Sequence, residues 1–270
     1  MNEPEFYLSK LADPVTKEPT TVHAFPEIKG VRDARVFLKN TYGFSEWEQG
    51  QVEYEKEMSP SGDYSQGTVQ QYLDEIAYDR PVYEHFLLNG VILDVGGGAG
   101  TLREFLPKTA NCVSVDPYIN APHEIPPARR EAYTCLAHQL DFICATAEFL
   151  PFLAESFDWV HMRSMLDHVQ VPDLALLEAR RVLKTGGKLL IGLYVEGGKS
   201  GVITSKQRIK EFVKKIFGLV GVDRWKDHHV WHPTYKGLIK LIEDNGFAVE
   251  DVYWQPQWHD QVCYVCAGKA

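Results

Sequence analysis

The chain has 270 residues, of which 44% are hydrophobic and 24% charged, and its formal net charge is −9. A chain of this length can bury one substantial core, and its acidic balance argues against broad electrostatic binding of nucleic acid or of an anionic membrane. No apolar run reaches the roughly 20 residues that span a bilayer. The N-terminus lacks the apolar segment of a secretory signal, and the five cysteines form no disulfide framework, so we expect a cytoplasmic protein.

The first 85 residues are predicted to form an N-terminal cap, and residues 86–270 a separate domain. Pro, Gly and acidic residues are scattered through the cap, and its apolar periodicity is weak. Its one helical pattern covers residues 68–88, where Pro81 is expected to kink the helix or to divide it into two.

From residue 91 onward, short apolar strands alternate with helices. Strands are predicted over residues 91–95, 112–116, 141–145, 157–162, 188–194, 248–254 and 261–267. Helices are predicted after Gly100 as far as residue 106, within 127–139, and over 172–183 and 234–245. This order predicts an α/β fold with a Rossmann-like, seven-stranded, mostly parallel sheet and helices on both faces.

An insertion over residues 195–232 follows the fifth strand. It contains an amphipathic helical pattern over 204–219, which is expected to dock on the body of the protein as a lid.

The first of these strands ends in a glycine-rich turn, Asp94-x-Gly96-x-Gly98-x-Gly100. Glycines let the backbone turn tightly and let a ligand lie against it, and a helix start offers free N–H groups to an anion. The spacing G-x-G-x-G differs from the dinucleotide-binding pattern G-x-G-x-x-G/A, which disfavours a nicotinamide oxidoreductase. Asp94 is expected either to contact the cofactor or to orient the glycine turn by hydrogen bonds.

The motifs that follow resemble those of class I S-adenosyl-L-methionine-dependent methyltransferases, in particular the domain of the ubiquinone/menaquinone-biosynthesis type. After the glycine turn, the matching segments are CVSVD (112–116), ATAEFLPF (145–152), SFDWV (156–160), MLDHV (165–169) and EARRVLKTGG (178–187). The resemblance covers residues 85–195 continuously. It implies S-adenosylmethionine as the cofactor and methyl transfer by in-line displacement.

The resemblance also implies a cofactor site, with Asp116 placed to bind the two ribose hydroxyls through its carboxylate. The implied cofactor-binding residues are Asp94, Gly96, Gly97, Gly98, Asp116, Pro117, Thr146, Ala147, Glu148, Met162 and Arg163. The chain departs from the family pattern at Thr146, where an aspartate usually binds the adenine amino group. Arg163 is expected either to pair with the cofactor carboxylate or to form a structural salt bridge.

The methyl acceptor is expected to be a small molecule that reacts through oxygen, nitrogen or carbon, and neither a nucleic acid nor a membrane. His168 and His229 are the candidate general bases. The segment DHHVWHP (227–233) is expected to form a wall of the acceptor pocket; no metal is predicted, because two of its histidines are adjacent and no cysteine lies near. Methylation of RNA or protein, or cofactor binding without catalysis, remain the alternatives.

Residues 11–19, LADPVTKEP, resemble the start of the small zinc ribbon that precedes some methyltransferase domains. Asp13 and Thr16 stand where that ribbon has cysteines, so no zinc is expected there. Cys263 and Cys266 lie in a predicted strand, where residues three apart point to opposite faces, so they are not expected to bind a metal either.

Overall fold

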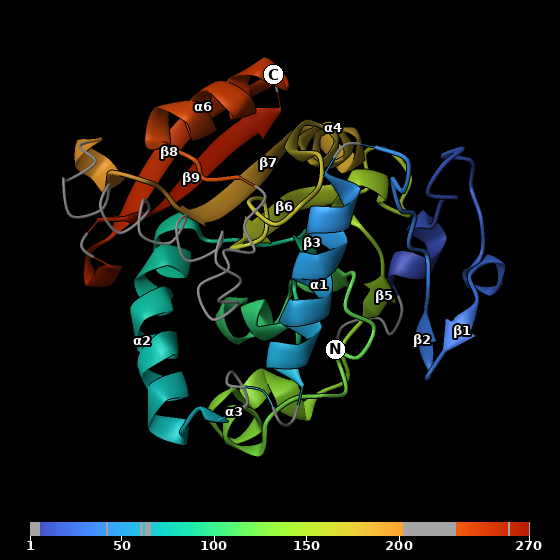
Figure 1. Ribbon diagram of the computed structural model, residues 1–270, viewed down its shortest axis with the longest axis horizontal. Helices are drawn as coiled ribbons and strands as arrows, with labels where there is room; N and C mark the ends of the chain where they lie inside the picture. The colour runs from blue at the N-terminus through green and yellow to red at the C-terminus, as the bar shows by residue number, and fades with distance from the viewer. Residues whose placement is uncertain are drawn as a thin grey trace, which may run out of the picture.

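The computed structural model describes residues 6–41, 43–59, 62, 66–201, 231–258 and 260–269. Its centre is a seven-stranded sheet with the strand order β5-β4-β3-β6-β7-β9-β8 (Figure 1). The strands are β3 (Val91–Val95), β4 (Asn111–Asp116), β5 (Phe142–Cys144), β6 (Phe157–Arg163), β7 (Leu183–Tyr194), β8 (Phe247–Gln255) and β9 (Val262–Lys269). The first five are parallel, and β9 pairs antiparallel with β7 and β8. The seven predicted strands and the mostly parallel sheet are confirmed.

Helices cover both faces of this sheet. One buried apolar cluster joins it to α4 (Pro172–Val182) and α6 (Tyr235–Asp244), and a second joins it to α2 (Val69–Phe86) and η4 (Thr101–Phe105). Between β4 and β5 lie α3 (Pro127–Ala132) and η5 (Thr134–Ala137), within the predicted range. The element after Gly100 is a short 3₁₀ helix. The sequence patterns therefore placed these helices correctly, with small differences in length and type.

Helix α2 begins at a capping box, in which Thr68 and Gln71 exchange hydrogen bonds, and it runs through Pro81 without interruption. The prediction that Pro81 divides this segment into two helices is wrong. Buried contacts on both sides of the proline hold the helix in one piece, because Asp79 pairs with Arg163 and Tyr83 contacts His161.

Helix α1 (Phe44–Met58) and a two-stranded ribbon of β1 (Glu27–Ile28) and β2 (Val31–Arg32) were not predicted. Trp47 of α1 is buried, and its ring centroid lies 5.8 Å from those of Phe37 and Phe44. The rings of Tyr54 and Tyr118 meet edge to face, with their centroids 6.2 Å apart. A few aromatic side chains thus attach α1 to the body, which explains its weak apolar periodicity.

The N-terminal segment also adds to the edge of the sheet. Asp33 forms a parallel bridge with Cys144 of β5, and the backbone N–H of Ala34 donates to the Cys144 carbonyl at 2.8 Å. The cap is therefore in backbone contact with the outermost parallel strand.

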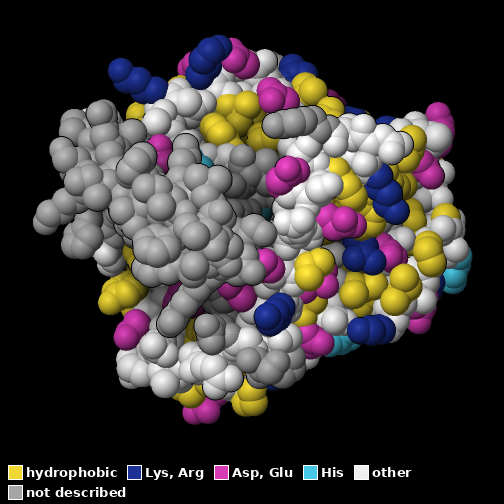
Figure 2. All heavy atoms as spheres, in the orientation of Figure 1, with side chains coloured by type: hydrophobic (Ala, Val, Ile, Leu, Met, Phe, Trp, Pro, Cys, Tyr) yellow, Lys and Arg dark blue, Asp and Glu magenta, His cyan; other side chains and the backbone are white. Residues whose placement is uncertain are grey.

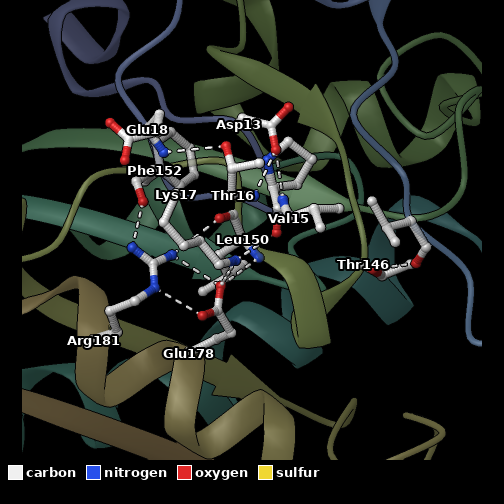
Figure 3. A network of polar contacts seen from close by, with 12 residues as sticks. Asp13, Val15, Thr16, Lys17, Glu18, Thr146, Leu150, Phe152, Glu178 and Arg181 are labelled. Carbon is white, nitrogen blue, oxygen red and sulfur yellow. Dashed lines mark hydrogen bonds and ion pairs between the residues drawn. The ribbon is translucent and has the colours of Figure 1, made fainter.

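A polar turn over residues 13–18 docks the cap on α4 (Figure 3). The Asp13 carboxylate accepts hydrogen bonds from the backbone N–H groups of Val15 (2.9 Å) and Thr16 (2.8 Å), which lower its pKa. A side chain therefore closes the turn at the position where the resembling ribbon has a metal-binding cysteine. The Lys17 ammonium reaches Glu178 at 2.7 Å, and Glu178 also pairs with Arg181 at 2.7 Å.

Within the described ranges, no helix is long and apolar enough to cross a membrane. The helix expected over 204–219 and most of the insertion lie outside the described residues. The division into a cap and a domain stays a prediction.

Candidate active site

The candidate site lies where the chain order of the sheet reverses. Strand β3 has β4 on one side and β6 on the other. In open α/β sheets, ligands bind beyond the carboxyl ends of the strands at such a point. The glycine turn follows β3, Asp116 ends β4 and Arg163 ends β6, so the topology brings together three of the predicted segments.

The glycines of the turn differ in what surrounds them. Gly96 and Gly98 have φ angles of +71° and +51°, which favour glycine. A Cβ on Gly96 would lie 2.6 Å from the Met165 side chain, and a Cβ on Gly97 would lie 2.5 Å from the Asp94 carboxylate. A Cβ on Gly98 would meet nothing within 4 Å. Gly96 and Gly97 therefore allow close packing, whereas Gly98 borders open space.

Asp116 is fixed beside that open space. One carboxylate oxygen accepts the Gly98 N–H at 3.0 Å, and the other accepts the Tyr118 N–H at 2.8 Å. The side chain is buried, and burial raises its pKa to about 6, although both backbone hydrogen bonds act in the opposite direction. Asp116 thus ties the glycine turn to the end of the neighbouring strand.

A shallow pocket that is open to solvent adjoins Gly98 and Ala99. Its walls come from α1, from the loop after β4 and from α3. The lining residues include Tyr54, Met58, Tyr118, Ile125 and Arg129. The unpredicted helix α1 therefore helps to form the candidate site.

On the side of β5, the N-terminal segment covers the residues predicted to contact adenine. The Pro117 carbonyl accepts a hydrogen bond from Arg35 at 3.1 Å, and the Thr146 hydroxyl donates to the Val36 carbonyl at 3.0 Å. Thr146 and Ala147 are both buried. The substitution of threonine for the usual aspartate thus accompanies a contact with the cap.

Glu148 is engaged in a structural contact. Its carboxylate accepts hydrogen bonds from the backbone N–H groups of Gln170 (2.8 Å) and Val171 (3.2 Å), and burial raises its pKa. These bonds fix the loop that leads from β6 into α4.

On the side of β6, Met162 is fully buried in the core and Arg163 forms an ion pair. The Arg163 guanidinium lies 2.5 Å from the Asp79 carboxylate of α2, and the Gln255 amide donates to Asp79 at 3.0 Å. Burial raises the pKa of Asp79. Arg163 was expected either to pair with the cofactor carboxylate or to form a structural salt bridge. The structure shows the salt bridge, with Asp79.

Asp94 points into the body of the protein. One of its carboxylate oxygens lies 2.7 Å from Nδ1 of His161, and His161 Nε2 lies 3.1 Å from the Tyr83 hydroxyl. Neither His161 nor Tyr83 was predicted as a functional residue. The available signal was a histidine in the middle of the apolar strand FDWVHMR (157–163), because a buried imidazole needs partners for both ring nitrogens.

Of the two candidate bases, the structure describes only His168. His168 lies in the loop after β6, its side chain is 36% exposed, and its Nε2 is 3.9 Å from the Asp167 carboxylate. His229 lies outside the described residues. The Trp231 N–H donates to the Asp167 carbonyl at 3.3 Å, so the end of the insertion contacts the loop that carries His168.

Comparison with known proteins identifies the family. A family model described as a methyltransferase domain matches residues 93–191. The ubiquinone/menaquinone biosynthesis C-methyltransferase UbiE of Sinorhizobium fredii is 38% identical over 104 residues, which cover 37% of this chain and 40% of that relative. The ubiquinone biosynthesis O-methyltransferase of Cereibacter sphaeroides is 30% identical over 180 residues, or 64% of this chain and 67% of the relative. The chain belongs to the S-adenosylmethionine-dependent methyltransferase family.

The match to the UbiE protein spans only two fifths of that relative's length. The family model covers the glycine turn and the strands around it. Among solved structures, a methyltransferase of Thermotoga maritima described as a possible histamine N-methyltransferase has a TM-score of 0.53 at 19% identity. That alignment covers 84% of this chain and 99% of the other. At this identity the likeness shows the methyltransferase fold alone.

The residues present fit the cofactor of this family. A carboxylate held by backbone donors at the end of β4 suits two neighbouring hydroxyls, and the space in front of Gly98 would be filled by any Cβ there. The cofactor, when bound, supplies an electrophilic methyl group on a sulfonium.

Proposed function

We propose that this chain transfers a methyl group from S-adenosylmethionine to a small-molecule acceptor by in-line displacement. The observation that carries the proposal is the contact between Asp116 and Gly98. The buried Asp116 carboxylate accepts the Gly98 N–H at 3.0 Å, and no atom covers Gly98 on the side where a Cβ would stand. This pairing supplies an acceptor for hydroxyls and a surface for a closely packed ligand at one place.

In this proposal, Asp116 holds the ribose hydroxyls, and the backbone of Gly96, Gly97 and Gly98 lies along the amino-acid part of the cofactor. Pro117, Thr146 and Ala147 surround the adenine, with the cap segment at Val36 behind Thr146. Protein groups that fix the donor in this way lower the entropic cost of reaching the in-line geometry.

The acceptor is proposed to be a small molecule rather than a nucleic acid. The net charge of −9 opposes binding to a polyanion. On the face shown in Figure 2, acidic and basic side chains are interspersed over the coloured surface rather than gathered by sign. The names of the two curated relatives describe biosynthetic C- and O-methyltransferases, which agrees with a small acceptor and leaves the acceptor atom open.

His168 is the proposed proton acceptor for a hydroxyl or an ammonium substrate. It is partly exposed in the loop after β6, close to Asp167. An acceptor that is already nucleophilic, such as an activated carbon, would need no base there. The dependence of turnover on His168 therefore reports the acceptor class.

Two measurements test the proposal. Calorimetry should show that S-adenosylmethionine and its product S-adenosylhomocysteine bind more tightly than NADH; tighter NADH binding would contradict it. Transfer of a labelled methyl group should then be measured on phenols, quinols, amines, total RNA and total protein. Label in RNA or protein alone would replace the small-molecule assignment, and cofactor binding with no transfer would favour the non-catalytic alternative.

A further inference from the structure

Arg129 of α3 is a second arginine at the candidate site. It lines the pocket beside Gly98 and Ala99, and its side chain is 19% exposed. Its guanidinium carbon lies 5.4 Å from the ring centroid of Tyr72 and 5.6 Å from that of Tyr133, within the range of cation–π contacts. These two rings belong to one buried cluster, against which Ala99 also packs. Aromatic contacts therefore hold Arg129 next to the glycine turn.

The hydrogen-bonding capacity of this guanidinium is largely unused within the described part of the chain. Its Nη2 lies 3.6 Å from a carboxylate oxygen of Glu75 on α2, which is longer than a hydrogen bond. Its Nε is buried and has no hydrogen-bond partner among the described residues. An arginine carries five N–H donors in a planar fork. The terminal N–H groups of Arg129 are therefore available to a ligand in the pocket.

Arg163 differs from Arg129 in this respect. Its guanidinium lies 2.5 Å from the Asp79 carboxylate, so it is already paired with a buried anion. A ligand carboxylate at Arg163 would have to share the guanidinium with Asp79, whereas Arg129 has only the more distant Glu75 among the described residues. Of the two arginines, Arg129 is the one that combines a position beside the glycine turn with unused donors.

The wall of the pocket carries one positive and one negative side chain. Besides Arg129 it contains Glu124, whose carboxylate accepts a hydrogen bond from the Tyr118 hydroxyl, and the other described residues of the wall are uncharged. A ligand that carries both an ammonium and a carboxylate matches this wall better than a ligand with a single charge. The amino-acid end of S-adenosylmethionine has this pair of charges.

We propose that Arg129 binds the carboxylate of the cofactor and so selects ligands that carry the complete amino-acid end. This inference rests on the proposed cofactor site, in which the ribose lies at Asp116 and the amino-acid end lies along the glycine turn. Gly98 donates to Asp116 and also lines the pocket that contains Arg129, so one bound ligand can reach both residues. A guanidinium can hold both oxygens of a carboxylate through two parallel hydrogen bonds.

The test uses two ligands that differ only in this carboxylate, S-adenosylhomocysteine and its decarboxylated analogue S-adenosyl-3-thiopropylamine. Calorimetry measures the affinity of each. We expect the native protein to prefer S-adenosylhomocysteine by about 20-fold and Arg129→Gln to prefer it by about twofold, because the substitution removes a charge-assisted contact with the carboxylate. Both ligands share the adenine, the ribose and the amine, so changes elsewhere in the site cancel in the ratio of the two affinities.

Arg130→Gln is the matched control. Arg130 is the next residue of α3, its side chain is exposed, and its substitution changes the net charge by the same amount. This variant should keep the preference of the native protein. An equal loss in Arg129→Gln and Arg130→Gln would reduce the effect to long-range charge and overturn the proposal. An unchanged preference in Arg129→Gln, or equal affinities of the native protein for the two ligands, would overturn it as well.

Arg129 also contacts Tyr72 and Tyr133, so the test needs a check on folding. Binding of the decarboxylated analogue shows that a variant keeps its fold. If Arg129→Gln does not fold, Arg129→Lys retains a cation at the two rings. Lysine cannot form the two parallel bonds, so the preference should fall by about threefold, and an unchanged preference would overturn the proposal. Failure of the native protein to bind either ligand would instead contradict the proposed function.

Discussion

The two sides of the candidate site use their charged residues differently. On the side of β4, the partners of Asp116 among the described residues are the backbone N–H groups of Gly98, which is uncovered and borders a pocket, and of Tyr118. On the side of β6, Arg163 and His161 are engaged with side chains of α2 and β3. Both sides lie near the reversal of strand order, where open α/β sheets bind ligands. A charged residue at the end of a strand can contact a ligand or stabilise the fold. The groups that it already binds are the better guide to which of the two it does.

If this comparison holds, substitutions on the β6 side should change mainly the stability of the protein, and substitutions on the β4 side mainly its affinity for the cofactor.

The largest effect is expected from Arg163→Ala. It would leave the buried Asp79 carboxylate without its cation and lower the free energy of unfolding by about 3 kcal/mol. Urea denaturation measures this loss, and adding Asp79→Asn in the same chain should recover part of it. A large fall in cofactor affinity with native stability would instead favour contact between Arg163 and the cofactor carboxylate.

Asp116→Ala should weaken S-adenosylmethionine binding by about 30-fold, or about 2 kcal/mol, through the loss of charge-assisted hydrogen bonds to the ribose. Calorimetry measures the change. Asp244→Ala removes a carboxylate that is 57% exposed on α6 and pairs with Lys240, so it serves as the control. Equal affinities of the native protein and Asp116→Ala would remove Asp116 from the site.

Gly98→Ala should weaken cofactor binding by about tenfold, because the new methyl group occupies the space in front of the turn and the residue has a positive φ. Gly186→Ala is the matched control, since Gly186 also has a positive φ and its Cβ would likewise meet nothing within 4 Å, yet it lies in β7 before the strand enters the core. Both variants should lose similar stability, and only Gly98→Ala should lose affinity. The same affinity loss in both would point to backbone strain alone.

The smallest effect is a pH dependence through Asp116. With a pKa of about 6, the carboxylate is largely ionised at pH 7.5 and mostly protonated at pH 5.5, so cofactor affinity should fall by about fourfold across that range. A protonated Asp116 accepts hydroxyls less well, and Asp116→Asn should show no such dependence. Calorimetry at several pH values measures both.

The stability of the cofactor-free protein should respond to the same group with the opposite sign. The folded protein holds the Asp116 proton more tightly than the unfolded chain, since its pKa is raised from 3.8 to about 6. The stabilising contribution is therefore complete below about pH 4 and is lost as the pH rises through about 6. A contribution that grows with pH in that interval would show that Asp116 is not buried in solution.

The sheet and the glycine turn could be predicted because their signals are local. Each buried strand contains a short stretch of mostly apolar residues, and the turn needs glycines at fixed spacing. Helix α1 has no such signal, since it contacts the body through a few aromatic rings such as Trp47 and Tyr54. The pairs of His161 with Asp94 and Tyr83 join residues 67 and 78 positions apart, and no local pattern encodes partners at that distance. For the same reason the sequence left both roles of Arg163 open.

The bridge from Asp33 to Cys144 has a consequence for the behaviour of the chain in concentrated solution. Strand β5 ends the sheet on one side, and an uncovered strand edge is a template for pairing with another molecule. The segment around Ala34 occupies part of that edge. At the opposite end, a register irregularity between Val249 and Asp251 interrupts the regular pairing of β8, and Glu250 and Asp251 bring charges to it. The N-terminal segment thus occupies backbone groups at which another molecule could otherwise pair, a role separate from any part it has in binding the cofactor.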